Sequence, residues 1–153
     1  MSEINWRDRC WVTTVFLVRK DEKVLLTWNG RLNTWIPIGG HIDPGETPEE
    51  AIKREVVEEA PGYEFVLIPE PHYENNGDVK VLKPYRFQIE KVPHHNLHMN
   101  FVFFGKCTRY TDIKENDEGD KLKWFSKDEI EQDPIMIESV RKLALEALTQ
   151  IKF

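Results

Sequence analysis

Short apolar runs separated by turn residues predict a chain built largely from strands. Residues 10–18 and 24–28 are apolar and rich in β-branched side chains, and the polar stretch 20–23 between them predicts a β-hairpin. Residues 97–107 form the strongest continuous apolar run, which is typical of a central strand buried on both faces. Shorter strands are predicted at residues 34–38, 63–68, 79–82, 85–92 and 122–125.

The clearest helix start lies in the middle of the chain. Thr47 is placed to cap the helix, Pro48 suits its first position, and Glu50 completes a capping box. Pro61 and Gly62 predict its end, because proline cannot donate to the helical hydrogen-bond ladder and restricts the residue before it. We therefore expect this helix to end promptly after Glu59.

The C-terminal region predicts a short capped turn and a closing helix. Ser126 caps the turn with Glu129 three residues on, and Asp133-Pro134 begins the helix. The apolar side of that helix consists of Ile137, Val140, Ala144, Leu148 and Ile151. Strands that alternate with two helices predict an α/β fold with a mixed β-sheet between helices, in a single domain of residues 1–153.

Composition and charge exclude several classes of protein. No apolar run among the 153 residues approaches the ~20 that a membrane-spanning helix needs, and residues 1–8 lack the apolar stretch of a secretory signal. The two cysteines, Cys10 and Cys107, offer little disulfide framework. We therefore expect a cytoplasmic protein without a membrane partner. The formal net charge of −6 disfavours attraction to a phosphate backbone, so we expect no nucleic-acid partner.

The negative charge is concentrated in residues 40–62, which hold seven acids and two bases. At 100° per residue, Glu55, Glu58 and Glu59 share one face of the predicted helix. Like charges at this spacing repel each other, and a bound divalent cation reverses the sign of that energy. Carboxylate oxygens favour Mg²⁺ or Mn²⁺ over softer metals. The alternative is a solvated acidic helix, in which Arg54 pairs with Glu58 and Lys53 pairs with Glu49.

A longer motif contains these acids. Residues 40–59 read GHIDPGETPEEAIKREVVEE. This segment resembles the signature box of the Nudix hydrolase family, in the positions of Gly40, Glu46, Arg54, Glu55, Glu58 and Glu59. The resemblance implies an α/β/α sandwich and metal-dependent hydrolysis of a nucleoside diphosphate linked to another group. Two departures are Gly62, which comes one place later than in the family box, and Pro37, which stands one residue away from the Gly39-Gly40 pair.

The resemblance also implies roles for individual residues. The metal ligands would be the carboxylates of Glu55, Glu58 and Glu59 and the carbonyl of Gly39. Arg54 and Glu46 would orient Glu55. Either Glu55 or Glu58 would polarise the attacking water, and Glu118, in the loop before the last predicted strand, is a further candidate for the base.

Four residues are candidates for substrate binding. His41 lies in the box loop and His98 at the start of the long apolar run, so both are candidates for contact with substrate. Trp35 can stack on a nucleobase, although large aromatics also serve as packing residues. Arg31 is a candidate for phosphate binding, as arginine often fills this role.

Other interpretations remain open at this stage. His94, His95, His98 and Cys107 can be read as a zinc site, against which Pro93 and the strand pattern argue. We favour a nucleoside triphosphate or modified nucleotide as substrate, giving the monophosphate and pyrophosphate, with ADP-ribose or a nucleotide sugar as the alternative. A nucleotide-binding regulatory module without hydrolysis and an acidic protein-interaction domain are the alternatives of other classes. The family resemblance also makes a homodimer plausible.

Overall fold

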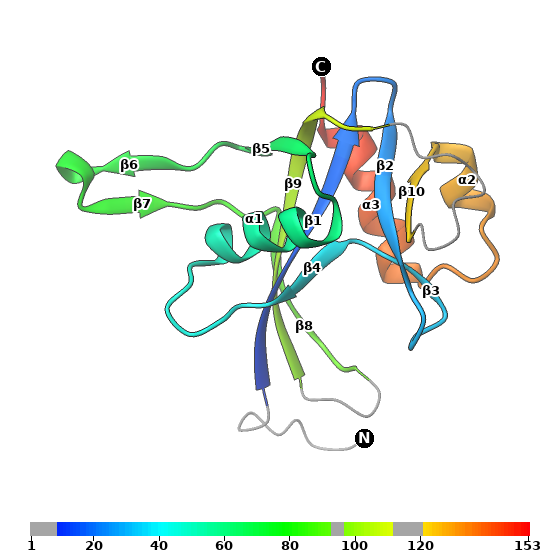
Figure 1. Cartoon of the computed structure of the whole chain (residues 1–153), viewed down its shortest axis with the longest axis horizontal. Helices are drawn as coiled ribbons and strands as arrows, with labels where there is room; N and C mark the ends of the chain where they lie inside the picture. Colours follow the sequence, from blue (N-terminus) through cyan, green and yellow to red (C-terminus); the bar gives the residue numbers. More distant parts are fainter. Residues whose placement is uncertain (1–8, 93–96, 112–120) are drawn as a thin grey trace.

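The fold is a mixed β-sheet packed between helices, seen here in a computed structural model that describes residues 9–92, 97–111 and 121–153 (Figure 1). The strands of the main sheet are β1 (Arg9–Arg19), β2 (Lys23–Asn29), β3 (Thr34–Ile36), β4 (Ile38–His41), β5 (Glu64–Ile68), β8 (Arg86–Glu90), β9 (Leu97–Arg109) and β10 (Leu122–Phe125). The helices are α1 (Pro48–Glu59), α2 (Lys127–Gln132) and α3 (Glu138–Gln150).

Two long parallel strands, β1 and β9, form the centre of the sheet, and every other pairing in it is antiparallel. The first half of β1 pairs with β4 and its last residues pair with β2. The first half of β9 pairs with β8 and its second half with β5. The sheet is therefore mixed, as the sequence predicts, and its two halves have different outer strands.

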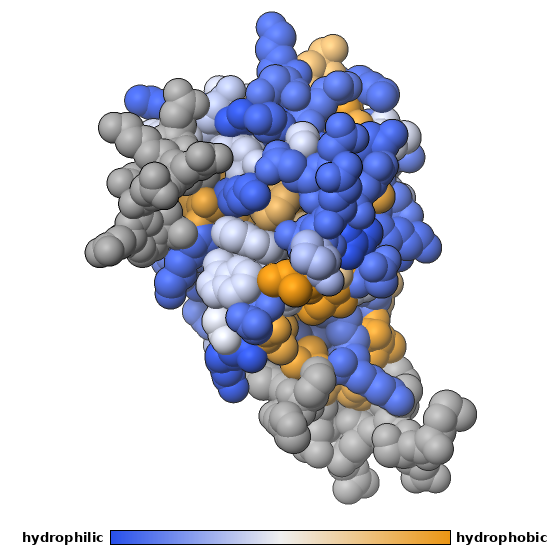
Figure 2. All heavy atoms as spheres, turned by 90° about the vertical axis from the view of Figure 1, so that its right-hand side faces the viewer, coloured by the Kyte–Doolittle hydropathy of each residue, from blue (hydrophilic) through white to orange (hydrophobic). Residues whose placement is uncertain are grey.

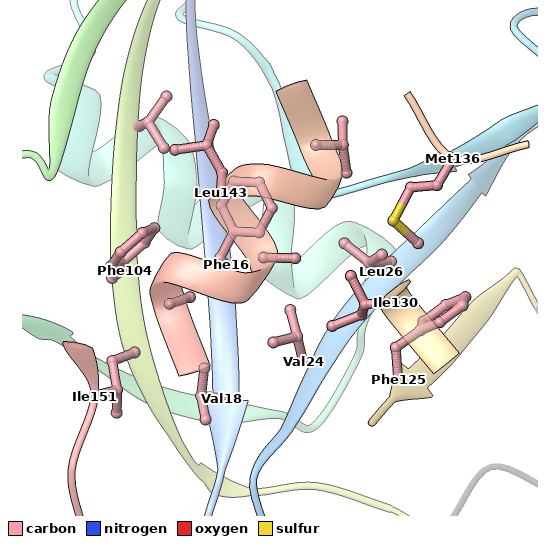
Figure 3. Packing of buried hydrophobic residues seen from close by; sticks show 14 residues of the cluster. Phe16, Val18, Val24, Leu26, Phe104, Phe125, Ile130, Met136, Leu143 and Ile151 are labelled. Atoms are coloured by element: carbon pink, nitrogen blue, oxygen red, sulfur yellow. The ribbon is translucent and has the colours of Figure 1, made fainter. Parts of the chain in front are cut away.

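Each face of the sheet packs against a helix. Val15 and Leu17 of β1 belong to the core that includes Ile52 and Val56 of α1. The alternate residues of β1 belong to the opposite core, in which Phe16 of β1 and Phe104 of β9 lie opposite Leu143 of α3 (Figure 3). Because successive strand residues point to opposite faces, one strand contributes to both cores. The predicted α/β class and the layered arrangement are confirmed.

The helix ends follow local sequence signals at α1 and α2. In α1 the Thr47 side chain accepts from the Glu50 N–H at 3.1 Å, and the Glu50 side chain accepts from the Thr47 N–H at 3.4 Å. Ser126 and Glu129 make the same reciprocal cap at α2. Helix α1 ends at Glu59, with Gly62 in the left-handed region at φ +85°. The predicted caps and the early end of α1 are confirmed.

The start of the closing helix differs from the prediction. Helix α3 begins at Glu138 rather than at Asp133-Pro134, and Ile137 is exposed rather than part of the apolar side. The buried residues of α3 are Val140, Leu143, Ala144 and Ala147. The side chain of Asp133 accepts hydrogen bonds from the N–H groups of the next turn, so these residues form a loop before the helix.

A small hairpin projects away from the sheet beyond α1 (Figure 1). It consists of β6 (His72–Glu74), a short 3-10 turn (Asn75–Gly77) and β7 (Val79–Val81). The sequence predicts β7 but not β6. Lys80 of the hairpin contacts the buried carboxylate of Glu49 in α1, which ties the hairpin to that helix.

One face of the molecule is mostly polar. The face shown in Figure 2 is covered largely by hydrophilic residues, with smaller apolar areas between them. Within the described ranges, none of the helices combines the length and the apolar character that crossing a bilayer requires.

Candidate active site

The Gly39-Gly40 pair brings β4 into close contact with both β1 and α1. A Cβ atom on Gly40 would meet the Glu55 carboxylate, with the Glu55 Cδ atom only 2.7 Å away. A Cβ atom on Gly39 would meet the backbone of β1, at 2.9 Å from the Thr14 Cα atom. The Gly39 N–H donates to the Glu59 carboxylate at 3.2 Å. Glycine at position 40 therefore allows the Glu55 carboxylate to lie directly against β4, and glycine at position 39 allows β4 to lie close to β1.

Arg54 is the centre of the hydrogen bonds around these carboxylates. Its Nε and Nη2 atoms donate to the two oxygens of Glu46, at 2.8 and 3.0 Å. Its Nη1 atom donates to Glu55 at 3.0 Å and to Glu58 at 3.4 Å, and Nη2 also donates to the His41 carbonyl at 3.0 Å. The planar guanidinium thus joins the box loop to α1, a geometry that a lysine ammonium cannot reproduce.

The three carboxylates at the C-terminal end of α1, those of Glu55, Glu58 and Glu59, differ in their exposure to water. The side chain of Glu58 is 57% exposed, whereas that of Glu55 is 14% exposed. Burial raises the pKa of Glu55, against the opposing effect of Arg54. Burial, together with the charge of Glu55, raises the pKa of Glu59 to about 7, although the Gly39 N–H opposes this rise. The site therefore holds carboxylates in surroundings that disfavour their negative charge.

The two ion pairs expected of a solvated acidic helix are present. Arg54 pairs with Glu58 at 3.4 Å, and Lys53 lies 3.9 Å from Glu49. Glu55 is nevertheless largely buried, and burial also acts on the pKa of Glu59, so these residues do not form a simply solvated acidic face. The two ion pairs account for the charge of Glu49 and for part of the charge of Glu58. They do not account for the burial of the Glu55 and Glu59 carboxylates.

The donor atoms of Glu55, Glu58 and Glu59 suit a hard divalent cation. All three side chains offer carboxylate oxygens, which Mg²⁺ and Mn²⁺ prefer, and a cation lowers the electrostatic cost of keeping them ionised. Among the residues that the structure describes, no three acidic, histidine or cysteine side chains converge as a preformed metal cluster. Arg54 supplies the positive charge beside Glu55 and Glu58 instead. A cation held here would share Glu55 and Glu58 with the Arg54 guanidinium.

The opposite face of the sheet presents a polar surface that the sequence analysis only partly identified. His41 of β4 and His98 of β9 lie on this face, with ring centroids 5.9 Å apart. Beside them the buried Asn100 accepts from the Thr14 hydroxyl at 3.2 Å and donates to Glu90 at 3.1 Å. The structure thus places two predicted substrate-binding residues in one polar cluster.

The same cluster contains residues that the sequence analysis missed. Gln88 donates to Glu90 at 2.5 Å, and His98 lies 3.9 Å from the other oxygen of that carboxylate. The one available signal was Asn100, a polar residue inside the longest apolar run, because a buried amide must find hydrogen-bond partners. We call Thr14, His41, Gln88, Glu90, His98 and Asn100 the polar face.

The other predicted residues occupy different positions. The Trp35 ring packs edge-on against Trp28 and Phe125, each with a centroid distance of 5.3 Å, and also contacts the α3 core. Arg31 lies in the turn between β2 and β3, where the Asn29 side chain accepts from its backbone N–H. Glu118 lies outside the described residues.

The structure argues against the zinc interpretation. His94 and His95 lie outside the described residues. His98 and Cys107 are both on β9, nine positions apart, which corresponds to roughly 30 Å along a strand. Cys107 is also buried in the α1 core, where burial raises the pKa of its thiol to about 11. His98 and Cys107 therefore cannot bind one ion together.

Comparison with known proteins identifies the family of this chain. The NUDIX domain matches residues 8–146. The chain belongs to the NUDIX hydrolase family. A crystal structure of a NUDIX-family hydrolase from Clostridium perfringens superposes with a TM-score of 0.77 at 29% identity, and the match covers 95% of this chain and 99% of that one. The predicted family is confirmed.

Two relatives carry names that describe nucleotide chemistry. A putative 8-oxo-dGTP diphosphatase of Bacillus subtilis (strain 168) is 30% identical over 112 residues, which are 73% of this chain and 63% of the relative. The match therefore spans less than two thirds of that protein. The nucleoside triphosphatase NudI of Salmonella schwarzengrund (strain CVM19633) is 29% identical over 114 residues, which are 74% of this chain and 77% of NudI.

The two departures of this NUDIX chain from the family box have small local effects. Pro61 follows Ala60, the C-cap residue of α1, and the Ala60 N–H still donates to the Val56 carbonyl at 2.7 Å. The last turn therefore closes before the proline, and Glu59 keeps its bond to the Gly39 N–H. Pro37 lies between β3 and β4, where it separates two short strands that pair with different neighbours.

Proposed function

We propose that this chain hydrolyses a pyrophosphate bond in a nucleoside diphosphate linked to another group, with Mg²⁺ or Mn²⁺ as cofactor. The observation that carries the proposal is the set of carboxylates on α1, held by Arg54 and the glycine pair against β4. The favoured substrate is a nucleoside triphosphate or modified nucleotide, which agrees with the names of both relatives. The expected setting is the cytoplasm, and we expect no nucleic-acid partner.

The chemistry requires water, a base and neutralisation of charge. Water adds to one phosphorus, the bond from that phosphorus to the departing diphosphate oxygen breaks, and the proton of the water passes to a carboxylate. When bound, a divalent cation neutralises phosphate charge and makes water more acidic. Glu55, Glu58 and Glu59, with the Gly39 carbonyl, would hold it. Arg54 and Glu46 keep Glu55 in position, because the guanidinium binds both carboxylates at once.

Three residues are candidates for the general base that takes the proton of the attacking water: Glu55, Glu58 and Glu118. Removing the base changes the pH dependence of kcat as well as its size, whereas removing a residue that only positions others lowers kcat at every pH. Glu118→Gln therefore tests its own role: an unchanged pH profile assigns the base to α1. Glu118 is a suitable test residue because it stands outside the box.

We further propose that the polar face binds the nucleobase. Amide and carboxylate groups of Gln88, Glu90 and Asn100 offer both donors and acceptors, which is what the edge of a base requires. The histidines at positions 41 and 98 add two flat rings beside this cluster. Trp35 and Arg31 lie elsewhere, so we propose for them at most a secondary part in substrate binding.

The proposal is tested by product analysis with a panel of substrates. The protein is incubated with Mg²⁺ and nucleoside triphosphates, 8-oxo-dGTP, ADP-ribose or a nucleotide sugar, and the products are separated by ion-exchange chromatography. We expect a nucleoside monophosphate and pyrophosphate from a triphosphate. A higher kcat/KM for ADP-ribose, with AMP and ribose 5-phosphate as products, favours the alternative substrate class. Nucleotide binding without any product, measured by calorimetry, favours the regulatory module instead.

A further inference from the structure

Strand β8 lies at an edge of the sheet and exposes apolar side chains there. Among the described residues, β9 is its only strand partner. Phe87 is 45% exposed and Ile89 is 41% exposed. Edge strands usually carry charges or prolines, because their free N–H and C=O groups otherwise pair with another chain. The edge strand β10, for comparison, carries Lys123, which pairs with Glu129. Strand β8 carries charges only at its two ends, Arg86 and Glu90, so its middle exposes two apolar side chains to water.

An aromatic surface continues from this edge onto the neighbouring strands. Trp11 of β1 is 46% exposed, and its ring centroid lies 6.3 Å from that of Phe87 and 5.9 Å from that of Phe101. Paired residues of neighbouring strands point to the same face, and the register places Ile89 on this face too. Single exposed apolar residues are normal, but a contiguous group marks an interaction site. We call Trp11, Phe87, Ile89 and Phe101 the aromatic surface.

The sequence of β8 is complementary to itself when it is reversed. If two copies pair antiparallel about Gln88, then Phe87 lies opposite Ile89 of the second copy, and Ile89 lies opposite Phe87. Arg86 lies opposite Glu90 of the second copy, on the other face of the sheet. Each position thus meets a side chain of matching chemistry, as a two-fold symmetric interface requires. Arg86 pairs with Glu146 of its own chain at 3.3 Å, and Glu90 accepts from Gln88 and Asn100. Their side chains are nevertheless 37% and 32% exposed, so both still reach the surface.

We propose that β8 is the contact through which two copies of this chain form a dimer, with the two strands antiparallel and centred on Gln88. This arrangement joins the two sheets into one. The aromatic surfaces of both copies then lie side by side on one face, and their polar faces lie side by side on the other. The proposal concerns assembly and is independent of hydrolysis.

The experiment is sedimentation velocity on the full chain and on two charged variants. Phe87→Glu and Ile89→Lys each place one charge opposite an apolar side chain, and they do so twice in a symmetric dimer. We expect each variant to raise the dissociation constant of the dimer by at least ~10-fold. When the two variants are mixed, the introduced carboxylate lies opposite the introduced ammonium, while the other pair stays native. The mixture should therefore form a heterodimer that neither variant forms alone.

A control variant separates this contact from general surface effects. Val79→Glu changes an apolar residue of similar exposure, 42%, on β7, and should leave the dissociation constant unchanged. Circular dichroism establishes that each variant is folded, and the mixing experiment supports the register even if one variant alone is less stable. A wild-type chain that is monomeric up to ~100 μM overturns the proposal. So does a dimer that both charged variants leave intact, or a mixture that stays monomeric.

Discussion

Replacing Gly40 by alanine tests the proposed site through one methyl group. The added Cβ would lie 2.7 Å from the Cδ atom of Glu55, whereas unstrained carbon atoms stay at least about 3.5 Å apart. The carboxylate must therefore retreat by about 1 Å. Because this group is the free end of a flexible side chain, its movement costs the fold little. A displacement of about 1 Å at a catalytic group reduces turnover by on the order of 100-fold.

Gly39→Ala is the matched control, because its Cβ would meet backbone instead. The Thr13 carbonyl and the Thr14 Cα atom lie in its way, and neither can rotate aside. We expect Gly40→Ala to lower kcat by about 100-fold while Tm changes by less than about 4 °C. We expect Gly39→Ala to lower Tm by more than about 5 °C. Calorimetry and a metal-dependent pyrophosphate assay measure both effects. If Gly40→Ala keeps wild-type turnover, the Glu55 carboxylate does not take part in the reaction.

Three further predictions concern Glu58 and Glu59 of α1 and Asn100 of the polar face. Glu58→Gln removes a charge from an exposed side chain and should lower metal-dependent turnover by at least ~100-fold with little change in Tm. Near-normal turnover of this variant in the same assay would reject the assignment of Glu58 to the site. Burial raises the pKa of Glu59 to about 7, so without metal the folded chain holds a proton that the unfolded chain releases at lower pH. The free energy of unfolding should therefore fall as the pH rises from about 4.5 to about 7, and Glu59→Gln should remove this fall. Urea unfolding in the presence of a chelator measures the free energy at each pH. An equal fall in the wild-type chain and in Glu59→Gln contradicts the interpretation. Asn100→Ala leaves Glu90 and the Thr14 hydroxyl without this partner and should cost about 1–3 kcal/mol of stability, while raising KM more than it lowers kcat. An unchanged KM in that variant would separate the polar face from substrate binding.

The elements that the sequence predicts correctly are those fixed by neighbouring residues. The start of α1 depends on Thr47, Pro48 and Glu50, which lie within four positions of one another. The β1–β2 hairpin likewise depends on a short polar turn between two apolar runs. The helical part of the family box belongs to the same class of signal, because Arg54, Glu55, Glu58 and Glu59 follow the period of a single helix. Local patterns of this kind are sufficient for most of the fold and for the carboxylates of α1.

The start of α3 shows what local patterns leave out. Asp133-Pro134 has the composition of a helix start, but the Asp133 side chain accepts from the N–H groups of Ile135 and Met136. Arg141, from the first turn of α3, donates to the carbonyls of Asp133 at 2.9 Å and Met136 at 3.1 Å. These bonds satisfy the backbone of a loop and hold it in place. Because they depend on a side chain several residues later, proline and aspartate alone could not reveal them.

The polar face was only partly predictable for a related reason. Asn100 bonds Thr14, which is 86 positions away in the sequence, and Glu90, which is ten positions away. These groups meet only because β9 pairs with β1 on one side and with β8 on the other. A single sequence indicates that Asn100 is a polar residue in a buried strand. It does not indicate which partners satisfy its amide.

The electrostatics of α1 support the proposal that its acidic end is a cation site rather than a stabilising surface. Glu55, Glu58 and Glu59 lie in the last two turns, where the helix dipole is negative, and no basic residue occupies the last turn. Arg54 offsets the charge of Glu55 and Glu58, while the Gly39 N–H is the group that bonds to Glu59. If the proposed cation binds here, it would relieve both the repulsion and the unfavourable dipole, so Mg²⁺ should stabilise the folded chain more at pH 8 than at pH 5. Its stabilising effect and its catalytic effect would then have the same electrostatic origin.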